Sequence, residues 1–244
     1  MSFDLMKLIG VNKDILSNLY MNGYSKSSLG IVEKGSIRTC EAQALYSIIV
    51  SNKYKNIIDI GTGNGFSSLY FCKALSDLGN GGMVETIDIT DKNKEKNVIE
   101  LFRRDGLEGF INFNVDRSDD VIPTLDDAYD FVLIDGEHTY EQTKRDFYNV
   151  FDKLSVGGCV AFHDVYKRPE DAVGPRTFLD EIADSGFVDV VFFGPELFDH
   201  FSYIEDNFDA HRISAKWRDH NYSYAHPSAD PKSLMAVAFK TKDS

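Results

Sequence analysis

The stretch at residues 57–65 constrains the fold of this chain more than any other. It reads Ile-Ile-Asp-Ile-Gly-Thr-Gly-Asn-Gly, so a run of β-branched residues ends in three alternate glycines. Such a run is typical of a buried parallel strand, and the glycines after it indicate a tight turn. From residue 66 to residue 78 the apolar residues follow a helical period. A glycine turn between a strand and a helix N-terminus is typical of a site for a nucleotide-like ligand.

The overall charge of the chain restricts its partners. The 244 residues include 39 acidic and 26 basic side chains, and the net charge is −13 at pH 7. Phosphate backbones repel such a chain, so we expect no nucleic-acid partner.

Cys40, Cys72 and Cys159 are far apart in apolar segments, which indicates reduced, buried thiols. No run of about 18 apolar residues is present, so we expect no membrane span and a cytoplasmic protein.

The rest of the chain alternates strand-like and helix-like segments. We expect strands at residues 57–60, 83–88, 110–114, 130–135, 159–162, 188–193 and 235–239. We expect helices at residues 3–20, 40–52 (capped by Thr39), 66–78, 91–104, 118–125, 139–154 and 175–185. This order predicts an α/β fold, a Rossmann-like, doubly wound, mostly parallel seven-stranded sheet with helices on both faces.

Polar side chains follow the predicted strands at the points where the strands end. They are Asp88, Ser118, Asp135 with His138, and the pair His163-Asp164. The strands themselves are apolar, so packing alone does not explain these residues. The strands that end at Asp135 and at His163 are expected to be neighbours, and their polar groups can therefore converge. Two carboxylates with an imidazole can bind a divalent ion or hold a general base, and both possibilities stay open here.

Two classes of protein that use this combination of strand, glycine turn and helix are alternatives for this chain. A nicotinamide-dependent oxidoreductase needs the spacing G-x-G-x-x-G, but Phe66 stands where the last glycine would be. Its Tyr-x-x-x-Lys pair is matched by Tyr140 and Lys144, although these follow a strand at the start of a helix. A ligand-binding protein without catalytic activity is the second alternative, because a fold does not determine a function.

Several motifs resemble those of class I S-adenosylmethionine-dependent methyltransferases. Asp59-x-Gly61-x-Gly63-x-Gly65 is similar to the first motif of that family. Residues 131–165 contain Ile-Asp-Gly-Glu-His, then Asp146, then Leu-x-x-Gly-Gly, then His-Asp-Val. This order resembles the pattern of a subfamily that includes sugar and natural-product O-methyltransferases. The similarity covers residues 36–190.

The resemblance implies S-adenosylmethionine as the cofactor and methyl transfer to a hydroxyl of a small molecule, such as a sugar or a natural product. The cofactor-binding residues that it implies are Asp59, Gly61, Thr62, Gly63, Gly65, Asp88, Ser118 and Asp135. Asp88 would accept hydrogen bonds from both ribose hydroxyls, since a carboxylate is an acceptor only. Ser118 would contact the adenine edge, although a serine there is also typical of a helix N-cap.

The catalytic and metal residues form the last group of predictions. We expect Asp135, His138 and His163 to be catalytic, and Asp135, His163 and Asp164 are candidate ligands for Mg²⁺ or another divalent cation. Magnesium prefers oxygen, and His163 stands where metal-dependent relatives have an aspartate, so catalysis by a base alone remains the alternative.

We expect two parts in the chain, an N-terminal helical extension at residues 1–52 and the S-adenosylmethionine-binding methyltransferase domain at 53–244. Within the domain, the aromatic stretch at 195–233 is expected to be an insertion on the substrate side or a dimer contact, so a homo-oligomer is possible.

Overall fold

The structure is a computed structural model, and it describes residues 24, 29, 37–126, 128–165, 174–186, 188–193 and 235–240. The helix expected at residues 3–20 and the stretch 195–233 lie outside these ranges, so their predictions are not tested.

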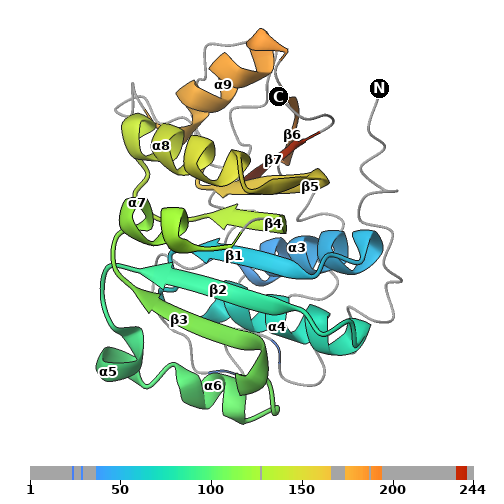
Figure 1. Cartoon of the computed structure of the whole chain (residues 1–244), viewed down its shortest axis with the longest axis vertical. Coiled ribbons are helices and arrows are strands. Elements are labelled where there is room, and N and C mark those ends of the chain that lie inside the picture. Colours follow the sequence, from blue (N-terminus) through green and yellow to red (C-terminus); the bar gives the residue numbers. More distant parts are fainter. Residues whose placement is uncertain are drawn as a thin grey trace, which may run out of the picture.

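A seven-stranded sheet forms the centre of the molecule, with the strand order β3-β2-β1-β4-β5-β7-β6 (Figure 1). The strands are β1 (Asn56–Ile60), β2 (Met83–Asp88), β3 (Ile111–Val115), β4 (Tyr129–Ile134), β5 (Leu154–His163), β6 (Asp189–Phe193) and β7 (Met235–Phe239). β1 to β5 run parallel, and β7 runs antiparallel to both β5 and β6. The predicted fold class is confirmed.

Helices cover both faces of this sheet. They are α3 (Thr39–Asn52), α4 (Phe66–Leu78), α5 (Lys92–Lys96), α6 (Ile99–Arg103), α7 (Ser118–Val121), α8 (Tyr140–Phe151) and α9 (Pro175–Ser185), with 3₁₀ turns η1 (Glu108–Phe110) and η2 (Ile122–Thr124). α3 and α4 pack on one face, and α7, α8 and α9 pack on the other (Figure 1).

The strands are apolar because both of their faces are buried. Along β1, Ile57 faces the core beneath α3 and α4, whereas Ile58 faces the core beneath α8 and α9. In β4, Val132 and Leu133 alternate in the same way. A strand buried on both sides reads as a continuous apolar run, and this is why the parallel strands could be predicted from the sequence.

Several predicted boundaries differ from the structure, and three of these differences have a clear physical reason. Thr39 is the first residue of α3 instead of its cap, and Arg38 holds the N-cap position in a capping box with Glu41. The helix expected at 91–104 is divided into α5 and α6, because Asn97 takes a left-handed backbone conformation with φ 52°. β5 begins at Leu154, five residues before the expected start, because the glycines at 157–158 lie within the strand.

Two predictions from composition have direct structural counterparts. Cys72 and Cys159 are buried free thiols, as expected, while the side chain of Cys40 is outside the described set. Among the described helices, none has the length and apolar character needed to cross a membrane.

Candidate active site

A pocket of about 400 Å³ opens where the parallel strands end, and its size suits a small ligand. Its walls come from the glycine turn after β1, the ends of β2 and β4, the loop after β3, and α8. The residues that line it include Gly61, Thr62, Gly63, Ser67, Asp88, Ile89, Ser118, Asp135, Gln142 and Asp146. Six of the eight predicted cofactor-binding residues are among them.

The glycine turn is pressed against neighbouring elements. Gly61 has φ +104°, and a Cβ atom there would lie 2.3 Å from the carbonyl oxygen of Asp135. Gly65 has φ +74°, and a Cβ atom there would lie 2.6 Å from Cγ1 of Val98. Both positions therefore need glycine for backbone conformation and for space. Gly61 lines the pocket, whereas Gly65 lies behind it and packs against the segment next to α6.

Asp59 also lies behind the pocket wall. Its carboxylate is fully buried and accepts hydrogen bonds from the hydroxyls of Ser67, at 2.8 Å, and of Ser68. Burial raises the pKa of Asp59 to about 7, although the two serine hydroxyls act in the opposite direction. Ser67 lines the pocket, so Asp59 is placed to act on a ligand through Ser67. Thr62 is similarly held, by a hydroxyl contact of 2.7 Å with Thr86.

Asp88 ends β2 and forms part of the pocket wall. Its Oδ2 accepts a hydrogen bond from the amide of Gly63 at 3.1 Å, and its Oδ1 accepts from the amide and the hydroxyl of Thr90, each at 3.0 Å. Lys92 Nζ lies 3.6 Å away. These contacts fix the orientation of the carboxylate. A carboxylate has about four lone-pair sites, and three of them accept these hydrogen bonds, so about one remains for a hydroxyl donor.

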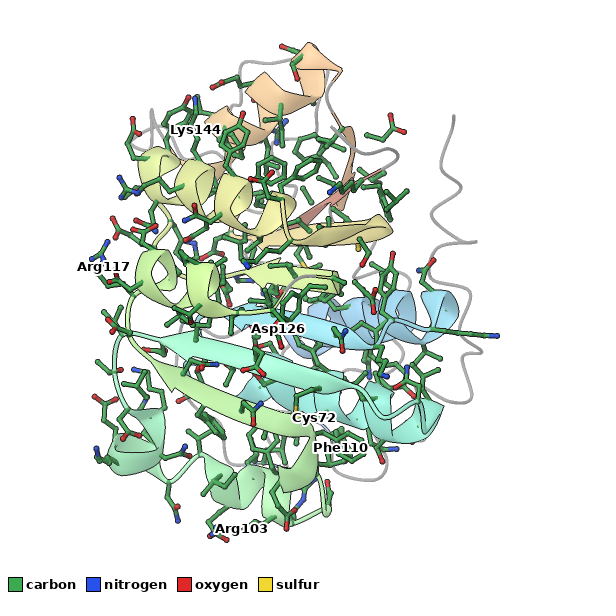
Figure 2. All side chains as sticks on the ribbon, in the orientation of Figure 1. Cys72, Arg103, Phe110, Arg117, Asp126 and Lys144 are labelled. Carbon is green, nitrogen blue, oxygen red and sulfur yellow. The ribbon has the colours of Figure 1, made fainter. Side chains whose placement is uncertain are left out.

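Ser118 is the first residue of α7, and Arg117 holds the N-cap position. The N-cap interpretation of Ser118 is therefore wrong. Its hydroxyl instead donates a hydrogen bond to Oδ1 of Asp146 on α8, at 2.6 Å. Arg117 projects outward at the edge where the strands end (Figure 2).

Asp135 is the first of three charged side chains in a row, and His163 and Glu41 are the other two. His163 at the end of β5 places Nδ1 2.9 Å from Oδ1 of Asp135 and Nε2 3.1 Å from Oε2 of Glu41, which belongs to α3. The side chain of His163 is 9% exposed, that of Asp135 is 8% exposed and that of Glu41 is 1% exposed. Burial opposes the charged imidazole, but the two carboxylates raise the pKa of His163 well above its usual range. Burial would raise the pKa of Glu41, yet His163 and Arg38 lower it to about 2.

His138 lies on the more open side of this row. It is 40% exposed, and its Nε2 lies 3.5 Å from Oδ2 of Asp164 and 3.8 Å from Oδ1 of Asp135. Asp164 adopts a left-handed backbone conformation with φ 51°, which short polar side chains tolerate. The structure thus brings together Asp135, His138, His163 and Asp164, as the neighbouring strand ends predicted.

The arrangement of His163 does not suit a metal ligand. A ring nitrogen must offer a lone pair to a cation, but both nitrogens of His163 face carboxylate oxygens as hydrogen-bond donors. Across the described ranges, no group of three or more His, Cys, Asp or Glu side chains is arranged to hold a metal ion. The residues as placed do not fit the predicted cation site.

The Tyr140–Lys144 pair has a structural role on the surface of α8. Lys144 Nζ lies 3.0 Å from the hydroxyl of Tyr140 and 3.2 Å from Oε1 of Glu181, and the tyrosine hydroxyl donates to the other oxygen of Glu181. Figure 2 shows Lys144 on the side of α8 that faces α9. Neither residue lines the pocket, so this pair does not form a dehydrogenase site.

Glu41, Ile89 and Gln142 are among the site residues that were missed from the sequence. Glu41 comes from a helix before the sheet, 122 residues from its partner His163, and no local pattern indicates this contact. Ile89 follows Asp88 at the pocket rim and is 72% exposed, which is unusual for isoleucine. Gln142 lines the pocket, and its spacing of four residues from Asp146 on one helix face was a usable signal.

Comparison with known proteins agrees with this geometry. Residues 58–165 match the family model described as a methyltransferase domain. The uncharacterized protein y4gI of Sinorhizobium fredii (strain NBRC 101917 / NGR234) is 28% identical over 137 residues, which are 53% of this chain. The chain spans only 15% of the length of that curated relative.

The solved structures that share the fold include two O-methyltransferases. The O-methyltransferase TomG from Streptomyces achromogenes, solved with SAM, superposes with a TM-score of 0.60 at 16% identity, over 95% of this chain and 92% of TomG. An O-methyltransferase from Bacillus cereus, solved with SAH, gives a TM-score of 0.60 at 13% identity, over 96% and 95% of the two chains. The match to the methyltransferase-domain model covers residues 58–165, and the chain as a whole shares the fold of these two O-methyltransferases.

Proposed function

We propose that this protein transfers the methyl group of S-adenosylmethionine to a hydroxyl of a small molecule. One observation carries the proposal: the cofactor-type pocket and the row of acidic and imidazole side chains meet at Asp135, which belongs to both. The methyltransferase family of residues 58–165 and the O-methyltransferases that share the fold support it.

The pocket residues suit the three parts of this cofactor. Asp88 can accept a hydrogen bond from a ribose hydroxyl, because its carboxylate is held in the wall with about one lone-pair site left. Ser118 stands at the adenine end, and the apolar Ile89 can cover a flat base. The turn at Gly61 and Gly63 brings the backbone close to the methionine end.

The reaction places few demands on the protein. When bound, S-adenosylmethionine supplies an activated methyl group: the new oxygen–carbon bond forms as the carbon–sulfur bond breaks, and its electron pair stays on sulfur. His138 is the residue placed to take the proton of the attacking hydroxyl at Nδ1, because the side chain is open to a substrate and the carboxylates face its other nitrogen, Nε2. Asp164 and Asp135 lie near that nitrogen and stabilise the imidazolium that forms. His163 and Glu41 hold Asp135 in position.

The remaining proposals concern the partners. A hydroxylated small molecule, such as a sugar or a natural product, is the proposed acceptor, with the segment at 195–233 on its side. A cytoplasmic location and assembly into a homo-oligomer remain proposals as well.

The first experiment is calorimetric titration with S-adenosylhomocysteine, with reduced nicotinamide cofactors titrated in parallel. We expect micromolar binding of S-adenosylhomocysteine alone, followed by methyl transfer to hydroxylated acceptors in a radiolabel assay. Binding of the nicotinamide cofactor, or of neither ligand, would refute the proposal.

A further inference from the structure

The hydrogen bonds around Ser118 determine which way its hydroxyl proton points. Oδ1 of Asp146 lies 2.6 Å from Ser118 Oγ and 3.0 Å from Nε2 of Gln142. The oxygen of the Gln142 amide accepts from Arg145 at 2.6 Å, so the amide nitrogen is the end that faces Asp146 and Ser118. Asp146 Oδ1 therefore accepts hydrogen bonds from Gln142 Nε2 and from Ser118 Oγ. The single hydroxyl proton of Ser118 is donated to Asp146.

The number of protons and lone pairs on the Ser118 hydroxyl determines which hydrogen bonds it can still make with a ligand in the pocket. A serine hydroxyl has one proton and two lone pairs. The proton is directed to Asp146, and one lone pair faces Nε2 of Gln142 at 3.3 Å. One lone pair remains for a ligand. Because Ser118 is half-buried and all three residues line the pocket, this lone pair is within reach of a bound base.

We infer that Asp146 and Gln142 are specificity-determining residues that lock Ser118 as a hydrogen-bond acceptor and so select a purine with an amino group at position 6. This inference rests on the proposed function. The exocyclic amino group of adenine donates to Ser118, whereas the carbonyl of a 6-oxo purine would meet a lone pair and stay unpaired. Asp146 is 1% exposed, so a water molecule does not easily replace its contact with Ser118.

The test compares two ligands that differ at position 6, S-adenosylhomocysteine and S-inosylhomocysteine, by calorimetry. The wild-type protein is expected to bind the adenosyl ligand about 10- to 100-fold more tightly, since an unpaired polar group is costly to bury. In Asp146→Ala the hydroxyl of Ser118 is free to rotate and donate to the 6-oxo group. We expect the ratio to fall to about threefold or less, with S-inosylhomocysteine binding better than to wild type.

Three further variants control this result. Asp146→Asn keeps an acceptor oxygen for Ser118 and should retain the wild-type ratio. Glu141→Ala, at an exposed position on the same helix, should change nothing. If Asp146→Ala does not fold, Ser118→Ala carries the test, because removal of the acceptor should also reduce the ratio to about threefold or less.

The outcomes separate the inference from the proposed function. No binding of S-adenosylhomocysteine to wild type would refute the proposed function. Tight binding of that ligand with no preference over S-inosylhomocysteine would overturn the inference alone. The inference would equally fail if Asp146→Ala weakened both ligands by the same factor, or if Ser118→Ala kept the full preference.

Discussion

At the scale of single residues, Asp59 shows how a buried acid makes stability depend on pH. Its pKa is about 7 in the folded protein, against an ordinary value of 3.8. The folded state therefore holds this proton more tightly than the unfolded state does. The free energy of unfolding should fall as pH rises from about 4 to about 7, since deprotonation is cheaper in the unfolded chain.

We predict that Asp59→Asn removes this dependence. Between pH 4 and pH 7, the wild type should lose on the order of 2–4 kcal/mol relative to the variant, as measured by urea unfolding at successive pH values. Glu108→Gln, at an exposed position, is the matched control. Parallel stability curves for wild type and Asp59→Asn would contradict the prediction.

Asp88 carries the predicted ribose contact. Asp88→Ala should reduce affinity for S-adenosylhomocysteine by about 10- to 100-fold, because a charge-assisted hydrogen bond is lost. The melting temperature should stay near that of the wild type, since the side chain lies at the pocket wall and not in the core. Glu95→Ala, an exposed acid on α5, serves as the control. Unchanged affinity in Asp88→Ala would remove the ribose assignment.

At the scale of elements, the approach of the glycine turn to β4 can be measured. Gly61 and Gly79 both have left-handed backbone conformations, but a Cβ atom would clash with Asp135 only at Gly61, while nothing lies within 4 Å at Gly79. Gly79→Ala should cost about 1 kcal/mol, the conformational term alone. Gly61→Ala should cost about 3 kcal/mol or more in denaturant unfolding and should abolish ligand binding. Equal effects of the two changes would mean that the turn can move away from β4.

The contact between α3 and β5 depends on Glu41. Glu41→Ala leaves the buried imidazolium of His163 with one carboxylate fewer, and we expect a loss of about 3–5 kcal/mol in the free energy of unfolding. Glu41→Gln should lose less, because its amide oxygen still accepts from His163 and from the amide of Arg38. Chemical denaturation measures both changes, with the exposed Ser51→Ala on α3 as the control. The prediction fails if Glu41→Ala is as stable as Ser51→Ala.

At the scale of the whole molecule, the strand order determines which polar side chains surround the pocket. The parallel strands end at one edge, so Asp88 at the end of β2, Ser118 at the start of α7 and Asp135 after β4 surround one pocket although they are far apart in the sequence. The antiparallel β7 lies between β5 and β6, and its first residue, Met235, pairs with His163, so β7 begins at the edge where the parallel strands end.

A metal requirement is a property of this whole arrangement. We expect methyl transfer to persist in EDTA, because both ring nitrogens of His163 are already bound to carboxylates. The assay compares turnover with EDTA, with added Mg²⁺ and in untreated protein. Loss of turnover in EDTA with recovery on Mg²⁺ would show instead that Asp135 and Asp164 hold a cation after His163 has moved.

Most of the fold could be predicted, because local patterns determine it. Apolar runs of strand length, helical periods and glycine positions are properties of neighbouring residues, and they placed β2, α4, α9 and β7 at the bounds that the structure has. The parallel topology then predicted that Asp135 and His163 converge. The division between α5 and α6 was missed because it depends on one left-handed backbone conformation at Asn97.

The sequence by itself determined the α/β class, the strand-end edge as the site, and the acidic and imidazole groups that stand there. Tertiary structure alone decided which atoms these groups meet. It placed Glu41 against His163, Asp59 behind the pocket wall, and Asp146 against Ser118. The physical reason is that the spacing of apolar residues in the sequence reflects which positions are buried, and burial favours an apolar residue at each position independently. A hydrogen bond between distant segments depends on the position of both partners, and no pattern in either segment records it.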